Sequence, residues 1–344
     1  MERIIECVPN FSEGRNMEVI EDIVKAIEEG GLQPDCGNPG VKILNIDPGY
    51  ATNRTVITFT GSPEAVLEGI FQGVKRASEL IDMRKHQGTH PRSGATDVLP
   101  LIPISGITLE ECASLARGLA ERIYTELDIP CYCYEAAAFK PERKNLAVCR
   151  AGEYEALPEK ISDPDRRPDF GPDNFTGQAA RSGAINVGAR NFLIAVNFNL
   201  NTKSTDLAKL IAYDVRESGH PKKSSDGTRM PGRLKGCKAI GWFIDEYDIA
   251  QVSMNITDIN TTPLHIAYEE VCKAARERGV QVTGTEIIGL IPKRVLMEAG
   301  RYYLGGKEDC TEDETMDIAI RTMGLDDLKE FIPKEKVIEF LMQG

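Results

Sequence analysis

The stretch VKILNIDPGYATNRTVITFTGSPEAVLEGIFQGVKRA, residues 41–77, is the part of the sequence that decides the fold. Apolar and β-branched residues dominate 41–46 and 54–60, and the turn residues Asp47-Pro48-Gly49 separate these two predicted strands. Ser62 then offers a helix cap, and Pro63 suits the first helical position, ahead of apolar residues at helical spacing. The stretch therefore predicts two paired strands followed by a helix.

Working outward, the same periodicity predicts further elements on both sides. A short strand at 3–8 and a helix at 17–29 precede the stretch. A strand at 96–104, a capped helix at 108–127 and a strand at 130–134 follow it. The first half of the chain is thus predicted to have the order β-α-β-β-α-β.

The second half repeats this order. We predict strands at 191–199, 238–245, 249–257 and 280–291, with helices at 202–217 and from Thr262-Pro263 to residue 278. Thr262-Pro263 parallels Ser62-Pro63 as a helix start, which favours an internal duplication. We expect an α/β (α+β) protein of two ferredoxin-like βαββαβ subdomains, residues 1–187 and 188–344.

Composition limits the classes of function. The chain of 344 residues is 41% hydrophobic and 27% charged, as in a soluble globular protein. No secretory signal or membrane span is predicted, so we expect no membrane partner. Nine scattered cysteines without a C-x-x-C motif are expected to be reduced, which indicates the cytoplasm. A net charge of −12 argues against nucleic acid as a partner.

Two segments contain many turn-forming residues and little apolar periodicity. Residues 162–188 are predicted to form a loop, and its length and two phenylalanines favour a functional loop over a disordered linker. Residues 219–236 form a basic stretch, for which a mobile flap over an anionic ligand and a solvated surface loop are both open readings.

The densest cluster of unusual residues is HQGTHPRSGATD, residues 86–97. His86 and His90 do not form a helical zinc pair, because Gly88 and Pro91 break the helix such a pair requires. We therefore predict no metal. Imidazole titrates near neutral pH, so His90 could serve as a general acid and base, or could only hydrogen-bond to backbone. Arg92 adds a fork of donors that suits a carboxylate.

Other candidates surround this cluster. Asn10 and a following helix N-terminus would offer donors to a polar ligand, while Ser12 could simply cap that helix. Asp47 precedes a turn and could be there only for turn chemistry. Arg54 is a further cation suited to a carboxylate.

Together these clusters resemble the glutamate formiminotransferase family. The resemblance rests on motifs spread over nearly the whole chain. They are ECVPNFSEGRN (6–16), Asp47 with TNRTV (52–56), IDM to D (81–97), RAGEYEALP (150–158), DFGP (169–172), GARNFLIAVNFNL (188–200) and MPGR (230–233).

The resemblance implies transfer of a formimino group from N-formimino-L-glutamate to N5 of tetrahydrofolate, as in histidine degradation, with folate between the two subdomains. It implies His90 as the catalytic histidine and a folate-contacting loop after DFGP, made of Gly171, Pro172, Asp173, Asn174 and Phe175. Asp47 would face the cationic donor or orient His90, and Asn10, Arg54 and Arg92 would bind substrate. Tetrahydrofolate is the expected co-substrate, without metal, and we expect a homodimer.

Alternatives remain open from the residues. Formyl and formimino groups differ by O against NH, so the donor could be N-formyl-glutamate, or 5-formyltetrahydrofolate acting with glutamate. A folate-binding protein without turnover, or an unrelated enzyme on the same fold, are further possibilities. Bifunctional relatives carry a helical cyclodeaminase domain, and because the sequence ends at Gly344 we expect that activity to be absent.

Overall fold

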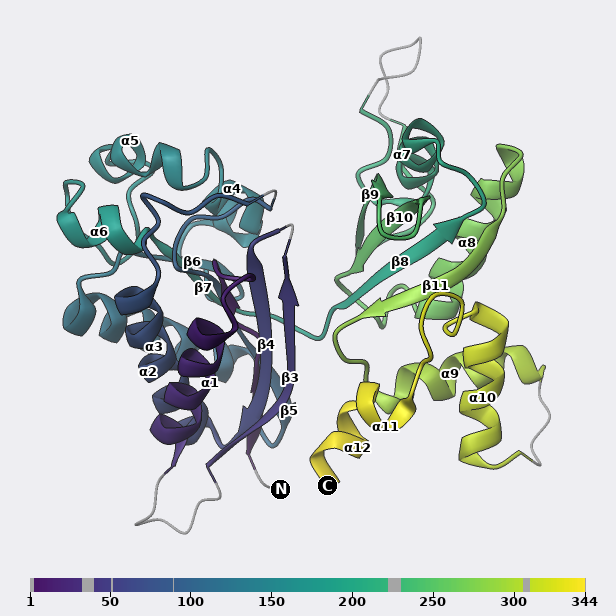
Figure 1. The fold of residues 1–344 in the computed structure, drawn as a ribbon, viewed down its shortest axis with the longest axis horizontal. Helices are drawn as coiled ribbons and strands as arrows, with labels where there is room; N and C mark the ends of the chain where they lie inside the picture. Colours follow the sequence, from purple (N-terminus) through teal and green to yellow (C-terminus); the bar gives the residue numbers. More distant parts are fainter. Residues whose placement is uncertain are drawn as a thin grey trace. The chain divides into compact units, whose positions relative to one another are not determined.

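The computed structural model describes residues 3–32, 40–50, 52–88, 90–221, 230–305 and 310–343. The chain divides into two compact units, Met1–Asn191 and Phe192–Gly344, each with its own sheet (Figure 1). This division follows β7 (Ile185–Ala189), whereas the predicted boundary between residues 187 and 188 falls inside that strand.

The first unit begins with β1 (Ile4–Cys7), β2 (Asn10–Phe11), α1 (Met17–Gly31), β3 (Val41–Gly49), β4 (Arg54–Gly61), α2 (Pro63–Leu80) and β5 (Thr96–Ser105). It continues with α3 (Leu109–Leu127), β6 (Cys131–Glu135), a 3-10 turn (Pro141–Lys144), α4 (Leu146–Cys149), a 3-10 turn (Tyr154–Ala156), α5 (Leu157–Ser162), α6 (Gly177–Ser182) and β7. The predicted β-α-β-β-α-β order is confirmed.

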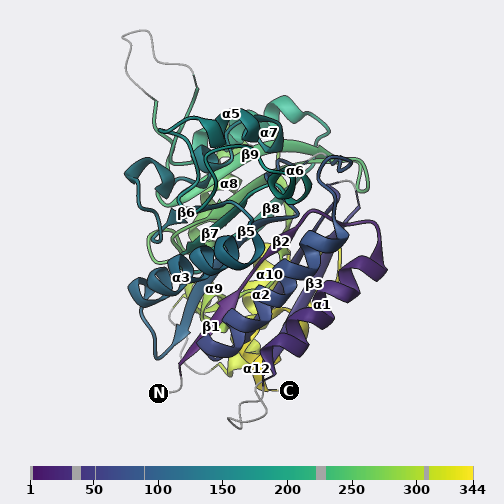
Figure 2. The ribbon, with the colours of Figure 1, turned by 90° about the vertical axis from the view of Figure 1, so that its left-hand side faces the viewer.

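The strands of the first sheet lie in the order β3, β4, β1 with β2, β5, β7, β6. The pairs among β1 to β5 are antiparallel, and β5–β7 and β6–β7 are parallel. Helices α1, α2 and α3 cover one face, as Figure 2 shows, and enclose the main core. Part of the other face, around Val98 and Tyr132, packs against residues of the 146–184 segment.

The second unit contains β8 (Ile194–Leu200), α7 (Thr205–Val215), β9 (Cys237–Ile244), β10 (Ile249–Ile256), α8 (Leu264–Glu277) and β11 (Val282–Ile288). Helices α9 (Lys293–Leu304), α10 (Glu312–Met323), α11 (Pro333–Lys336) and α12 (Ile338–Gln343) follow. Its antiparallel sheet has the order β11, β8, β10, β9. This matches β5, β1, β4, β3 of the first unit, so both halves have the same topology and the predicted repeat of topology is confirmed.

Two predictions about local structure are wrong. The segment 162–188 is not one loop: it contains α6 and most of β7, whose five residues are all buried between β5 and β6. Such a strand has no polar alternation to reveal it. Asp47-Pro48-Gly49 is not a turn but the end of β3, where Pro48 is tolerated because β3 is an edge strand.

Two of the predicted helix caps are confirmed and two are wrong. Ser62 caps α2 with Pro63 at its first turn, and Thr108 forms a capping box with Glu111, both as expected. Asn16, not Ser12, caps α1, and Thr262 donates to the carbonyl of Lys235 while α8 starts after Pro263. Residues 222–229 of the basic stretch 219–236 lie outside the described residues.

Candidate functional site

Three segments that are far apart in the sequence meet at Asn53. This buried residue ends the turn before β4 in a left-handed conformation (φ 48°). Its side-chain oxygen accepts from Gly14 N at 3.1 Å, and its Nδ2 donates to Gln87 O at 2.9 Å. His86 Nε2 donates to Asn53 O at 2.9 Å. One amide therefore joins the opening motif, the TNRTV motif and the histidine segment.

Close backbone packing fixes these segments further. A Cβ on Gly88 would lie 2.2 Å from the carbonyl oxygen of Thr52, so only glycine fits there. Ser12 Oγ donates to Gly94 O at 2.7 Å, and Ser12 N donates to Ala95 O at 2.8 Å. Ser12 thus ties the opening motif to the far end of the histidine segment.

Asp97 is the buried carboxylate of the site, with an exposed fraction of 0%. Asn10 pairs with Val98 and Phe11 with Thr96, so Asp97 is the extra residue of a β-bulge in β5. Bulges redirect a side chain, and here the carboxylate reaches the face of the sheet on which Arg54 bonds to Asn10. One of its oxygens also accepts from Ser93 N at 2.8 Å.

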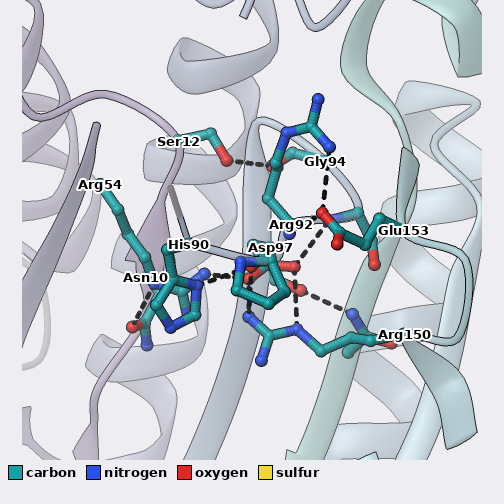
Figure 3. A network of polar contacts seen from close by, with 12 residues as sticks. Asn10, Ser12, Arg54, His90, Arg92, Gly94, Asp97, Arg150 and Glu153 are labelled. Atoms are coloured by element: carbon teal, nitrogen blue, oxygen red, sulfur yellow. Dashed lines mark hydrogen bonds and ion pairs between the residues drawn. The ribbon is translucent and has the colours of Figure 1, made fainter. Parts of the chain in front are cut away.

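Two arginines converge on Asp97, as Figure 3 shows. Arg54 from β4 and Arg150 from the residues after α4 both form ion pairs with its Oδ2. Burial alone would raise the pKa of Asp97, but the two guanidinium groups hold it below its usual value. Burial, followed by the charge of Arg150, lowers the pKa of Arg54. Two cations facing one anion leave an excess positive charge, which suits a carboxylate ligand.

His90 lies beside this cluster (Figure 3) and is half-buried. Its Nδ1 lies 2.7 Å from Pro91 O, so Nδ1 carries the hydrogen and Nε2 keeps its lone pair in the neutral ring. Burial, then the charge of Arg54, lowers the pKa of His90 to about 4, with Arg150 adding to the effect and Asp97 opposing it. At neutral pH the ring is therefore an uncharged proton acceptor.

Arg92 is already paired within the unit. It donates to Glu153 at 3.1 Å and to both oxygens of Glu155, at 2.6 and 2.8 Å. Tyr154 N donates to Arg92 O at 2.9 Å, and Arg150 donates to Pro91 O at 3.0 Å. The segment 150–155 thus clamps the residues beside His90, and the geometry favours a positioning role for Arg92 over direct contact with substrate.

The structure places Asn10 in the cluster but not Asp47. Asn10 Oδ1 accepts from Arg54 Nε at 3.1 Å. Asp47 and Asn10 both oppose Val56, from either side of β4, so they share a face two strands apart, roughly 10 Å. The exposed side chain of Asp47 forms no hydrogen bond or ion pair with any residue that the structure describes. The carboxylate that the fold brings next to His90 is Asp97.

The predicted folate loop, 171–175, follows a well-anchored residue. Asp169 pairs with the buried Arg143 at 2.6 Å and accepts from Cys133 N at 2.8 Å. Asn174 is exposed, and Asp173 is paired with Arg167 on the surface. Gly171 and Pro172 are partly exposed, whereas Phe175 packs on the cluster of Val98 and Tyr132.

Arg181, at the end of α6, binds backbone carbonyl groups of α2. Its Nε donates to Ser78 O at 3.1 Å and its guanidinium also donates to Glu79 O at 2.5 Å. It satisfies carbonyl groups in the last turn of α2, where a cation also complements the helix dipole.

Four residues of this cluster were not predicted from the sequence as site residues: Asp97, Arg150, Glu153 and Asn53. Asp97 and Arg150 stood inside quoted motifs, but nothing in the chain indicates that residues 53 positions apart form an ion pair. Glu153 has positive φ (56°), a strained conformation of the kind that clusters at functional sites. Among the residues described, no group of three or more His, Cys, Asp or Glu could hold a metal ion.

Two family models match the chain. The N-terminal subdomain of the formiminotransferase domain matches residues 4–190, and the formiminotransferase domain matches residues 195–343. The two sheet units with their shared strand order thus correspond to the two parts of one domain type. The chain belongs to the formiminotransferase family.

Named relatives agree with this assignment. A glutamate formimidoyltransferase of Streptococcus pyogenes serotype M1 is 42% identical over 88% of this chain and 94% of its own length. The one of Thermoplasma acidophilum is 39% identical, over 88% and 92%. The formimidoyltransferase-cyclodeaminase of Gallus gallus is 44% identical over 100% of this chain, which spans only 61% of that protein.

Proposed function

We propose that this protein transfers the formimino group of N-formimino-L-glutamate to N5 of tetrahydrofolate and releases glutamate. The observation that carries the proposal is the neutral His90, whose Nε2 carries no hydrogen, beside Arg54 and Arg150, whose charges Asp97 only half compensates. Relatives of matching length are named glutamate formimidoyltransferase, and the family is that of the formiminotransferase domain.

The chemistry requires one proton acceptor that later becomes a donor. N5 of the folate attacks the amidine carbon and forms a C–N bond, and the proton of N5 moves to Nε2 of His90. The tetrahedral adduct collapses when the bond to the glutamate nitrogen breaks, and the imidazolium returns the proton to that nitrogen. Glutamate leaves as an amine, and the folate keeps the formimino group.

Charge couples donor binding to this proton transfer. A carboxylate of the donor placed against Arg54 and Arg150 would offset the positive field that disfavours the imidazolium. The pKa of His90 would then rise toward neutrality only when substrate is bound. We assign Asp47, exposed on the same sheet face as Asn10, to the cationic amidinium of the donor, and residues 171–175 to contact with folate.

A turnover assay tests the proposal. Purified protein is given tetrahydrofolate with N-formimino-glutamate or N-formyl-glutamate, and 5-formyltetrahydrofolate with glutamate. Formimino transfer by the wild type, lowered at least ~100-fold in His90→Ala with folate still bound, is the expected result. Transfer from the formyl donors alone, or folate binding without turnover, would replace the proposal by the formyltransferase or the binding-protein reading.

We further infer a cytoplasmic homodimer that works without metal. In support of a reducing compartment, each of the eight described cysteines is unpaired. No described helix is long and apolar enough to cross a membrane. Sedimentation equilibrium tests the dimer. Turnover that survives exhaustive chelation tests the absence of metal.

A further inference from the structure

Asn186 is a polar residue in a strand whose other side chains are all aliphatic. Strand β7 is buried on both faces, and Asn186 itself has an exposed fraction of 0%. Its register neighbours are Val98 on β5 and Tyr132 on β6, which are also buried. An aliphatic residue would suit this position better for packing alone, because a buried amide needs hydrogen-bond partners.

The amide of Asn186 is only half satisfied. Its Nδ2 donates to the backbone oxygen of Asp97 at 2.9 Å. Its Oδ1 is buried and accepts no hydrogen bond from any residue that the structure describes. A buried acceptor without a partner destabilises a fold, so stability alone does not explain an asparagine at this position. The bond to Asp97 is the feature that explains it.

That bond holds the residue of β5 that the pairing with β2 leaves out. Phe11 opposes Thr96 and Asn10 opposes Val98, so Asp97 lies between the two pairs as the extra residue of the bulge. A bulge residue lacks a regular partner on the neighbouring strand, and its direction depends on what else holds its backbone. The amide of β7 holds it from the other side of β5.

The residues just before Asn186 hold the chain that leads to Asp97. Two backbone hydrogen bonds, of 2.7 and 3.0 Å, join residues 182–184 to residues 93–95. Gly183, with φ 70°, has no room for a Cβ, which would lie 2.2 Å from a carbonyl oxygen of the partner segment. The two segments therefore run close together, and the amide supplies the next contact, at the residue whose carboxylate enters the site.

We infer that Asn186 is a positioning residue that acts through Asp97. The carboxylate of Asp97 pairs with Arg54 and Arg150, and it meets both only while the bulge directs it to their face of the sheet. By holding the backbone of the bulge, the amide keeps the two guanidinium groups in place. The inference rests on the function proposed above, in which these arginines receive a carboxylate of the donor and of the product glutamate.

Asn186→Leu tests the inference, because it keeps nearly the same volume and removes the hydrogen bond. Calorimetry measures binding of glutamate and of tetrahydrofolate to the full chain. We expect glutamate to bind roughly 10-fold more weakly, because recognition of a carboxylate by arginine depends on geometry. Tetrahydrofolate should bind as it does to the wild type, and the KM for N-formimino-glutamate should rise more than the KM for tetrahydrofolate. Asn186→Ala removes the same bond and takes its place if the leucine variant does not fold.

Thr60→Val is the matched control. Thr60 is 5% exposed and its Oγ1 donates to Ile5 O at 2.9 Å, so this change also removes a buried bond from a side chain to the backbone of the first sheet. Thr60 lies near the opposite end of β4 from Arg54, about 20 Å along the strand. The control should lose stability without any change in glutamate binding.

A double-mutant cycle with Asp97→Asn separates positioning from general stability. If Asn186 acts through the carboxylate, Asn186→Leu should change glutamate affinity by less than about twofold once that carboxylate is removed. An undiminished loss in the Asp97→Asn background would mean that Asn186 acts by another route, and would overturn the inference. If Asp97→Asn does not fold, the comparison of Asn186→Leu with Thr60→Val decides.

The outcomes separate this inference from the proposed function. Glutamate binding that is equal in the wild type and Asn186→Leu, or absent from both, would overturn the inference, and so would an equal loss in Thr60→Val. A wild type that transfers no formimino group, but whose glutamate affinity depends on Asn186, would disprove the function and support the positioning role.

Discussion

The charge of His90 in the ligand-free protein offers the sharpest test of the site. Its pKa moves from 6.5 to about 4, mainly through burial and then through Arg54. This lowering of the pKa corresponds to roughly 3 kcal/mol against the imidazolium. At pH 5.5 most of His90 should then be neutral, whereas an unperturbed histidine would be mostly charged.

Nitrogen-detected NMR of the imidazole groups measures this directly. The chain has only four histidines, so the His90→Asn spectrum identifies the His90 signals by their loss. Removing one cation with Arg150→Gln should raise the midpoint, because Arg150 disfavours the charged ring. Arg122→Gln, in which the lost cation pairs instead with Glu68 and Glu126, should leave it unchanged.

Substrate should act in the same direction as Arg150→Gln. Saturating glutamate brings carboxylates to the arginines and should raise the His90 midpoint, with a smaller effect in Arg150→Gln. A wild-type midpoint near 6.5 without ligand would refute the reasoning, because burial and the excess positive charge would then not lower the pKa of His90.

Three further predictions concern stability and local packing. Asp97→Asn should lower the free energy of unfolding in urea by ~3–5 kcal/mol, because it leaves two partly buried cations without their carboxylate. A loss below ~1 kcal/mol would contradict the pairing. Gly88→Ala should lower turnover strongly and the melting temperature only slightly, since a Cβ 2.2 Å from Thr52 O must displace the histidine segment. A crystal structure of the variant with this segment in its original place would disprove the prediction. Burial raises the pKa of Glu6 from 4.5 to about 7. As pH rises, the unfolded state therefore loses this proton at a lower pH than the folded state. The free energy of unfolding should fall by up to about 3 kcal/mol between pH 4.5 and pH 7. Glu6→Gln should remove that part of the pH dependence, and an unaltered dependence would count against it.

The sequence was enough to predict the topology of both halves, because caps and periodicity are local signals. Ser62 and Thr108 mark helix starts within a few residues of the groups that they bond. Strand β7 was missed because a parallel strand buried on both faces has no alternation, and its asparagine and glycine resemble loop residues. Pro48 was wrongly predicted to lie in a turn because proline usually ends a strand, whereas the edge strand β3 tolerates it.

The site was only partly predictable. His90, Asn10 and Arg54 were identified and lie together. Asp47 was expected to face the cationic donor or to orient His90, and the carboxylate that the fold places beside His90 is Asp97, which was not predicted. A bulge sets the direction of Asp97, and bulges depend on the register between strands, which no local pattern reveals. Arg150 likewise reaches the site only through tertiary packing.

The separations at Asn53 and Asp97 also determine when the site can form during folding. Asn53 joins residues 39 and 34 positions away, and Asp97 joins residues 43 and 53 positions away. Each of these bonds closes a long loop of chain. The chain must lose the entropy of that loop before the bond can stabilise the fold. We expect helices α1 and α2 to gain protection from hydrogen exchange early in refolding. The pKa of His90 should be lowered only when the first sheet closes in the last, rate-limiting step of folding. A chain that the ribosome has not yet extended to Arg150 would therefore contain His90 without a formed site.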